Sequence, residues 1–384
     1  MMICPSCGST DTRMVLETDG LPVLCNTLAD SAEDARSCPR GDMHLCLCSR
    51  CSLLFNAIFD IRLLSYDTGY ETSLHFSAVF REYAKELART LVDRLELRER
   101  PVIEIGCGRG EFLKILHEEG CGECHGYDES HLPGLLKTPS SVHLHATRYP
   151  QLSDAPHGDL VCCRHVLEHV PNPDSLLPSL RSALAPSGVI YLEVPNALFT
   201  LHHLGIWDLI YEHCCYYTQE SLWFALSNHG LQPMEIRSTY AGQFLSALAT
   251  ADDGPPRHTS PKGSCLIDSL CSSFTEARTM KIRRFDQLLE DSLLKHETVA
   301  IWGAGSKGVT FLNTLHCGEE LEIVVDSNPR KQGMHIPGTG QKIIAPEDDT
   351  LKAVSLVFLM NPIYMTEVKG QLEDIRSRAK LICA

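Results

Sequence analysis

Residues 102–110 carry the sequence V-I-E-I-G-C-G-R-G, an apolar run that passes directly into a glycine-rich turn. We expect the run to form a buried β-strand and residues 110–119 to form a helix. Gly106, Gly108 and Gly110 let the backbone approach a ligand closely because they lack a side chain. Such a strand–turn–helix unit is typical of nucleotide-cofactor sites, although several different cofactors would fit it.

A second apolar run, 124–127, ends in Asp128, about twenty residues after the glycine turn. In nucleotide-binding folds, a carboxylate at this place accepts hydrogen bonds from both ribose hydroxyls. Further apolar runs at 159–163 and 188–194 alternate with helical patterns. This alternation predicts an α/β fold with a parallel, doubly wound sheet.

Other segments extend this pattern in both directions. Further elements expected are helices over 75–97, 174–185 and 265–295, and a hairpin near 231–239 and 243–250. Residues 252–263 are rich in Pro, Gly and charge and should form a linker. A second strand–helix alternation, which predicts a smaller Rossmann-like domain, comprises strands near 298–302, 321–326 and 354–359 and helices near 306–316 and 363–377.

Two C-x-x-C motifs lie in the first 60 residues, a segment that we expect to be loop-rich. They supply Cys4, Cys7, Cys48 and Cys51. This spacing lets paired thiolates reach one tetrahedral zinc ion at about 2.3 Å. Cys25 and Cys38 lie between the motifs and leave the choice of ligands open. Four thiolates fill the coordination sphere, so the zinc would be structural and would fold a segment without a core of its own.

The bulk composition narrows the class of function. The net charge of −15 disfavours nonspecific binding to nucleic acid or to an anionic membrane surface. We find no apolar stretch of the roughly 18 residues that a membrane span requires, and no signal-peptide pattern. A soluble, cytoplasmic protein is therefore expected, and its 18 cysteines should be reduced.

At this point the chain resembles the class I methyltransferases. The matching segments, in order, are E-I-G-C-G-R-G, Y-D, D-L-V-C-C-R-H-V-L-E-H-V and P-S-G-V-I. The resemblance implies S-adenosylmethionine as cofactor, held by Glu104, Arg164, Asp128 and the three glycines of the first turn. The alternative interpretation of that turn is a dehydrogenase that binds NAD.

The arrangement as a whole resembles the sugar-nucleotide C-methyltransferases of deoxysugar biosynthesis, a natural-product pathway class. That family joins an N-terminal zinc-binding domain, a methyltransferase domain and a C-terminal Rossmann-like domain. The resemblance places these at 1–65, 66–252 and 264–384, the last as the substrate domain. It implies methylation of the carbon next to the ketone of a nucleotide-linked 4-keto-6-deoxy sugar. The family often has Tyr-His-Glu-His where this chain has I-Y-E-H at 210–213.

Carbon methylation beside a ketone requires a base and a group that stabilises the enolate oxygen. Histidine suits the first role because its pKa lies near neutrality. We expect His213 to be the base and the adjacent Glu212 to orient or polarise it. His169 and Tyr211 are candidates for contacting the ketone or enolate oxygen. Tyr70 and His75 are candidates for further substrate contacts.

A second glycine turn, W-G-A-G-S-K-G at 302–308, precedes Asp326 with dinucleotide spacing. By pattern alone it is an NAD site. A methyltransferase needs no second redox cofactor, so we expect no NAD here. We expect Gly303, Gly305 and Lys307 to lie near the substrate diphosphate, because a helix N-terminus favours phosphate.

Two other functions remain open. One is methylation of an oxygen, a nitrogen or another natural-product intermediate. The other is a zinc-knuckle recognition module that binds nucleic acid or protein, which the acidic charge disfavours. We expect a small-molecule substrate and neither a nucleic-acid nor a membrane partner. Monomer and dimer remain equally open.

Overall fold

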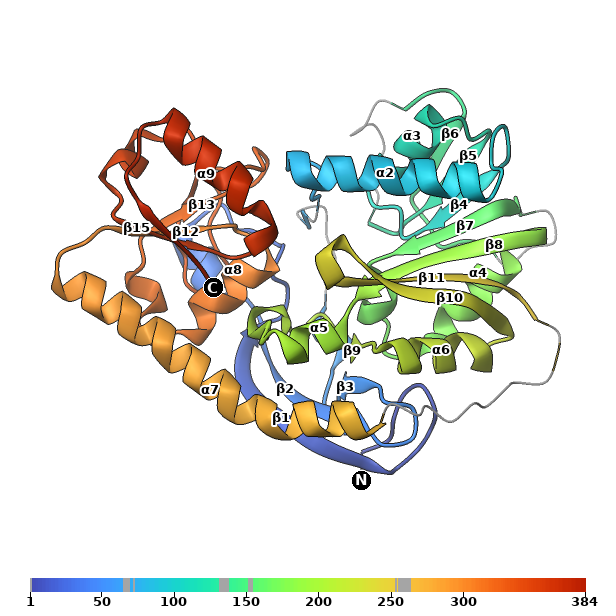
Figure 1. Cartoon of the computed structure of the whole chain (residues 1–384), viewed down its shortest axis with the longest axis horizontal. Coiled ribbons are helices and arrows are strands. Elements are labelled where there is room, and N and C mark those ends of the chain that lie inside the picture. The colour runs from blue at the N-terminus through green and yellow to red at the C-terminus, as the bar shows by residue number, and fades with distance from the viewer. Residues whose placement is uncertain are drawn as a thin grey trace.

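The structure, a computed structural model, describes residues 2–64, 70–71, 73–130, 138–150, 155–252, 254 and 264–384. In this part of the chain the strands form sheets of four, seven and five strands. Figure 1 shows the seven-stranded and five-stranded sheets as two α/β domains that stand side by side, with the four-stranded sheet below them. Among the described residues, no helix is both long and apolar enough to span a bilayer.

The seven-stranded sheet has the order β10-β11-β8-β7-β4-β5-β6. Strands β4 to β8 are parallel, and the β10–β11 hairpin adds antiparallel to β8, which confirms the predicted fold class. The strands are β4 (Val102–Ile105), β5 (Cys124–Tyr127), β6 (Val142–His145), β7 (Gly158–Arg164), β8 (Leu184–Pro195), β10 (Leu231–Thr239) and β11 (Phe244–Ala251). The helices of this domain are α2 (Ala78–Arg94), α3 (Glu111–Glu118), α4 (Leu177–Ser182), α5 (Ala197–His202) and α6 (Gln219–Asn228).

The five-stranded sheet has the order β14-β13-β12-β15-β16, with every pairing parallel. It confirms the predicted second Rossmann-like domain and adds two edge strands, β14 and β16, that were not predicted. The elements are α7 (Ser264–Leu294), β12 (Val299–Trp302), α8 (Ser306–Thr314), β13 (Ile323–Val325), β14 (Ile343–Ile344), β15 (Leu356–Leu359), α9 (Met365–Asp374) and β16 (Lys380–Cys383).

The expectation that the first 60 residues are loop-rich is wrong. They form a short helix and a three-stranded antiparallel sheet with elements α1 (Ala32–Arg36), β1 (Thr12–Pro22), β2 (Arg40–Cys48) and β3 (Leu54–Asn56). The β1–β2 ladder shifts register between Met14 and Leu16 and again between Thr18 and Leu21. These irregularities break the strict alternation by which a strand is recognised in a sequence.

A fourth strand completes this N-terminal sheet from far along the chain. Strand β9 (Cys215–Tyr216) pairs antiparallel with β3, so that Leu54 faces Tyr216 and Phe55 faces Cys215. The backbone N–H of Asn56 also donates to the carbonyl of Cys214 at 2.9 Å. The N-terminal sheet therefore holds the segment that immediately follows His213.

The N-terminal sheet also shares its hydrophobic cores with the rest of the molecule. Met43 and Leu45 of β2 lie in one core with Phe274 of α7 and Phe311 of α8. Burial of each such side chain contributes about 1.5–3 kcal/mol. Helix α7 runs beneath both domains, from β1 to the C-terminal domain (Figure 1). The N-terminal sheet is thus stabilised by apolar contacts with the other domains, in addition to any metal that it binds.

Candidate active site

A cleft of about 860 Å³ lies between the seven-stranded domain and the C-terminal domain. Both glycine turns line it: Gly106 and Gly108 from one side, Gly303 and Gly305 from the other. Each turn follows the carboxyl end of a central parallel strand, which is where open α/β sheets bind ligands. The cleft therefore has a glycine turn of the nucleotide-binding type on each of two opposite sides.

The first turn is built for close contact with a ligand. Gly106 has a φ of 77°, and a Cβ there would lie 2.2 Å from Val166 Cγ2, so only glycine fits. The N–H of Gly108 donates to Asp128 Oδ2 at 2.8 Å, and Ser130 N–H donates to Asp128 Oδ1 at 2.8 Å. Asp128 thus fixes the turn and also lines the cleft, as the ribose-binding role requires.

Glu104 lies at the floor of the cleft and is only 3% exposed. Its Oε2 has no hydrogen-bond partner among the described residues, and burial raises the pKa of the carboxyl to about 8. A buried carboxylate without a partner is costly unless a bound donor satisfies it. The ammonium group of S-adenosylmethionine is such a donor, so these residues fit that cofactor.

Arg164 also lines the cleft, but its guanidinium is already paired. Nη2 lies 3.0 Å from Glu193 Oε1, and the group stacks over the Phe112 ring at 4.1 Å from its centroid. Glu193, which was not predicted as a site residue, is fully buried and also accepts from the Tyr191 hydroxyl at 2.8 Å. Arg164 is therefore placed as a support of the cofactor wall, with its charge balanced by Glu193.

His169 and His213 meet on the wall of the cleft. Their rings lie edge to face with centroids 4.7 Å apart. His169 ends the 3₁₀ helix Leu167–His169 after β7, and His213 lies in the loop before β9. The structure thus brings together two candidate residues from distant segments of the chain.

Glu212 is fully buried. Its Oε1 accepts from Cys25 N–H at 3.0 Å, and its Oε2 accepts from the Tyr70 hydroxyl. The same Oε2 lies 3.9 Å from His169 Nδ1. The carboxylate that the sequence places beside His213 therefore faces His169.

His213 is half-buried, and its buried Nδ1 atom has no hydrogen-bond partner among the described residues. Burial, followed by the nearby His169 and His165, holds the pKa of His213 well below its usual value. The imidazole is consequently neutral at physiological pH, and a neutral ring nitrogen is what a general base requires.

Tyr211 does not reach the cleft. Its hydroxyl accepts from Asp60 N–H at 2.9 Å and donates to the Asp60 carbonyl at 3.3 Å. It is buried and absent from the cleft-lining residues. The structure thus places Tyr211 behind the cleft wall, where it anchors the segment before Glu212.

Tyr70 and His75, the two candidates for substrate contacts, both line the cleft. Between them lies Glu71, which sequence reasoning missed. Glu71 is buried and accepts from Arg109 of the first turn at 2.9 Å and from Arg330 of the C-terminal domain at 3.3 Å. This carboxylate links the two halves of the cleft.

In the C-terminal turn, Gly303 has a φ of 113° and Asp326 Oδ2 accepts from Ala304 N–H at 2.8 Å. Lys307 lines the cleft, where its ammonium is ion-paired with Asp208. A second cation, Lys331, is buried and donates to the Ala304 carbonyl at 3.2 Å. Lys331 belongs to no recognisable sequence motif, so the sequence analysis did not identify it.

Four thiols gather as the C-x-x-C pairs predict. The Sγ atoms of Cys4, Cys7, Cys48 and Cys51 all lie within 4.8 Å of one another. The Cys4–Cys51 and Cys7–Cys48 Sγ distances are 3.6 and 3.5 Å. Tetrahedral zinc with bonds of about 2.3 Å requires Sγ separations of about 3.8 Å, so the four thiols fit this ion. Cys25 and Cys38 lie outside this group.

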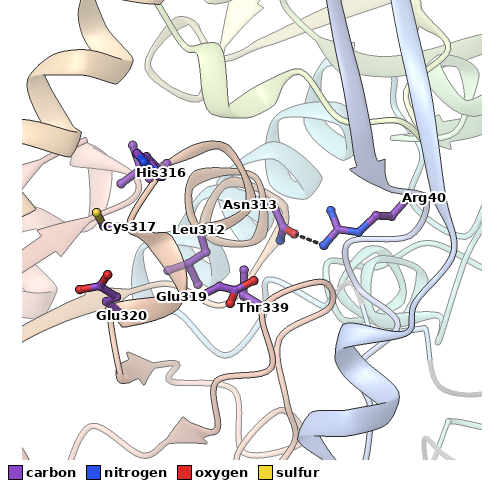
Figure 2. A pocket seen from close by; sticks show the side chains of 9 residues that line it. Arg40, Leu312, Asn313, His316, Cys317, Glu319, Glu320 and Thr339 are labelled. Carbon is purple, nitrogen blue, oxygen red and sulfur yellow. Dashed lines mark hydrogen bonds between the residues drawn. The ribbon is translucent and has the colours of Figure 1, made fainter.

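A smaller pocket of about 250 Å³ lies on the C-terminal domain and is shown in Figure 2. Arg40 of the N-terminal sheet reaches it and donates to Asn313 Oδ1 at 3.1 Å and to the Gly338 carbonyl at 3.0 Å. Glu319 and Glu320 add two carboxylates. We interpret this pocket as part of the interface between the N-terminal sheet and the C-terminal domain.

The chain matches the methyltransferase domain family over residues 77–236 and the C-methyltransferase C-terminal domain family over residues 269–384. It is 24% identical over 367 residues to the C-methyltransferase NovU of Streptomyces niveus. The aligned region covers 90% of this chain and 86% of NovU. A shorter match links it to the ubiquinone biosynthesis O-methyltransferase of Neisseria meningitidis serogroup C, with 26% identity over 110 residues. That match covers 26% of this chain and 46% of the other.

Among solved structures, the 1,6-didemethyltoxoflavin-N1-methyltransferase of Burkholderia thailandensis is 19% identical, with a TM-score of 0.35. The match covers 46% of this chain and 82% of that one. The two family matches and the near full-length relative agree with the turn, the floor carboxylate and the two-domain cleft. The chain is therefore a class I S-adenosylmethionine-dependent methyltransferase, and its C-terminal segment matches the C-methyltransferase C-terminal domain family.

Proposed function

We propose that the protein methylates the carbon next to the ketone of a nucleotide-linked keto-deoxysugar. The observation that carries this proposal is the cleft itself, which has a histidine pair on its wall and a nucleotide-type glycine turn at each end. One turn serves the cofactor. The other leaves a phosphate-favouring helix N-terminus for the nucleotide part of the acceptor.

Each residue has an assigned task in this reaction. When bound, S-adenosylmethionine supplies an electrophilic methyl group on a sulfonium. His213 takes the proton from the carbon beside the ketone, because its ring is neutral and faces the cleft. His169, whose Nδ1 lies 3.9 Å from Glu212 Oε2, contacts the oxygen on which negative charge develops.

The reaction balances without a further reactant. The C–H bond of the acceptor breaks and its proton moves to His213, while the electron pair spreads onto the ketone oxygen. That pair then forms the new C–C bond as the S–CH₃ bond breaks. Tyr211 acts as a positioning residue, since its hydroxyl ties the 210–213 segment to Asp60.

The C-terminal domain, residues 264–384, is the substrate domain in this proposal. Gly303, Gly305 and Lys307 line its side of the cleft. Lys331 lies beneath the same turn and adds positive charge. A diphosphate there would place the sugar ring toward the histidine pair.

The direct test is methyl transfer from isotope-labelled S-adenosylmethionine to a panel of nucleotide-linked keto sugars. We expect label in a carbon-bound methyl group adjacent to the ketone, identified by NMR of the product. The same keto sugars without the nucleotide should react much more slowly. Label on oxygen or nitrogen, or transfer only to acceptors that lack a nucleotide, would overturn the proposal.

A further inference from the structure

The outer edge of the seven-stranded sheet carries a cluster of titratable side chains that methyl transfer does not use. It consists of Glu123, His125, His143 and His145. His125 of β5 and His143 of β6 are direct partners in the parallel ladder. Parallel neighbours stand about 4.8 Å apart, and partners in register share one face of the sheet. The fold thus holds the two imidazoles side by side.

The positions of the ligand atoms suit a metal ion. One ligand atom each from Glu123, His125 and His143 lies within 4.8 Å of the others. His143 Nε2 is 2.7 Å from Glu123 Oε2, and the two rings stack with centroids 4.9 Å apart. Two imidazoles and one carboxylate, with solvent at the fourth position, form a common zinc ligand set.

An independent observation supports the site from behind. His125 Nδ1 lies 3.3 Å from His145 Nε2, within hydrogen-bond distance. Metal-binding histidines almost always use their second nitrogen in this way, which fixes the ring and its tautomer. With Nδ1 engaged, Nε2 of His125 is the ligand atom.

We propose that Glu123, His125 and His143 bind a divalent transition-metal ion, with zinc the best suited, at the outer edge of the sheet. The cation takes the place of the direct contact between His143 Nε2 and Glu123 Oε2. This site is separate from the four-cysteine cluster and from the proposed methyl transfer. It joins β5 to the edge strand β6, which is paired on one side only among the described strands.

The site lies one layer from the cofactor end of the cleft. The ring of His145 stacks on Tyr127 with centroids 4.6 Å apart, and Tyr127 lines the cleft. A metal that fixes β6 therefore also fixes the strand that leads into Asp128. We expect metal binding to stabilise this edge in the whole chain.

The test is calorimetric titration of ZnCl₂ into the full-length protein after its starting metal content has been measured. We expect one further ion per chain in the wild type. His143→Gln and Glu123→Gln should each lose that ion, while the starting content stays unchanged. His145→Phe should keep the ligands but weaken binding about 10–100-fold, because the supporting hydrogen bond is gone.

A matched control is available on α5. His202 and His203 are also neighbouring exposed histidines, with rings that lie edge to face and centroids 4.8 Å apart. His202→Gln should leave the further ion in place. Circular dichroism shows whether each variant folds. Absence of a further ion in the wild type, or its retention in both His143→Gln and Glu123→Gln, would show that the cluster is only a solvated surface.

Discussion

Asp128 and Asp326 accept the same pair of backbone hydrogen bonds in two different domains. Asp128 accepts from the glycine turn through Oδ2 and from the residue two positions later through Oδ1, both at 2.8 Å. Asp326 accepts from Ala304 N–H and Asn328 N–H in the same way, also at 2.8 Å each. The two domains therefore present matching nucleotide-type turns to one cleft.

Asp128→Ala should weaken S-adenosylmethionine binding by about 2–3 kcal/mol, through loss of a charge-assisted hydrogen bond. Calorimetry measures the change directly. Asp326→Ala is the matched control, because it removes the equivalent carboxylate from the other turn and should leave cofactor affinity unchanged. Equal losses in the two variants, or none in Asp128→Ala, would contradict this assignment.

The second turn should not bind NAD, despite its spacing. The turn opens into the same cleft as the cofactor site, and methyl transfer needs no redox cofactor. Mass spectrometry of the purified protein and titration with NAD measure this. Stoichiometric NAD in the protein, or micromolar affinity for it, would show that the C-terminal domain is a redox site.

His213→Ala should keep the fold and cofactor binding but lose roughly 10²–10⁴ in turnover, as expected for removal of a general base. It should also lose the exchange of the substrate α-proton with solvent deuterium. The pKa of His213 lies well below 6.5, so its base form persists as the pH falls through that value. Wild-type exchange should therefore show no loss centred near pH 6.5.

The deuterium measurement separates catalysis from packing. If His213→Ala exchanges the α-proton at the wild-type rate, the base lies elsewhere. His169→Ala is then the next variant, because its ring is the neighbour of His213. A variant that loses cofactor affinity as well would indicate a structural role for the residue.

Zinc removal should lower turnover although the cysteines lie outside the cleft. Cys48 ends β2, which pairs with β3, and β3 pairs with β9 directly after His213. Cys48→Ser should therefore lose zinc and lower kcat more than it lowers cofactor affinity. Cys38→Ser, which changes a cysteine outside the cluster, is the control. Elemental analysis showing no zinc in the wild type, with full activity in chelator, would sink this prediction.

Stability should fall between pH 6.5 and 9 because of His165. Its Nε2 lies 3.1 Å from Glu193 Oε1 and its Nδ1 lies 3.6 Å from Glu168 Oε1. Burial lowers the pKa of His165, but the two carboxylates outweigh burial and raise it to about 9. Since the unfolded value is about 6.5, the stabilisation is complete below that pH and is lost as the pH rises through 9.

Thermal denaturation of wild type and His165→Gln across this range measures the effect. The wild-type melting temperature should decline more steeply with pH, and the two curves should converge above pH 9. His203→Gln, at an exposed position on the end of α5, should follow the wild type. Parallel curves for wild type and His165→Gln would show that the proton on His165 does not contribute.

Local patterns predicted the parts of the site that are local in sequence. The first turn and Asp128 lie where expected because strand, glycines and carboxylate follow one another with fixed spacing. Strand β6 was missed because V-H-L-H is a short edge strand with half-exposed polar residues. The bulges of β1 likewise hid a long strand.

Contacts between distant segments could not be predicted from the sequence. Glu212 and His213 are adjacent in the chain, yet the carboxylate faces His169, because Cys25 and Tyr70 hold it on that side. Tyr211 turns to Asp60 for a similar reason. Glu71 could not be found at all, since its partners Arg109 and Arg330 come from different domains. Such partners depend on tertiary packing, which no periodicity records.

The pairing of β3 with β9 sets a rule for building chimaeras between relatives. A hybrid that takes residues 1–64 from one parent and the remainder from another would join a foreign β3 to a native β9, beside His213. Cross-strand fit at Leu54–Tyr216 and Phe55–Cys215 would then be left to chance. Chimaeras designed to exchange acceptor preference should therefore take residues 1–64 and residues 196–218 from the same parent.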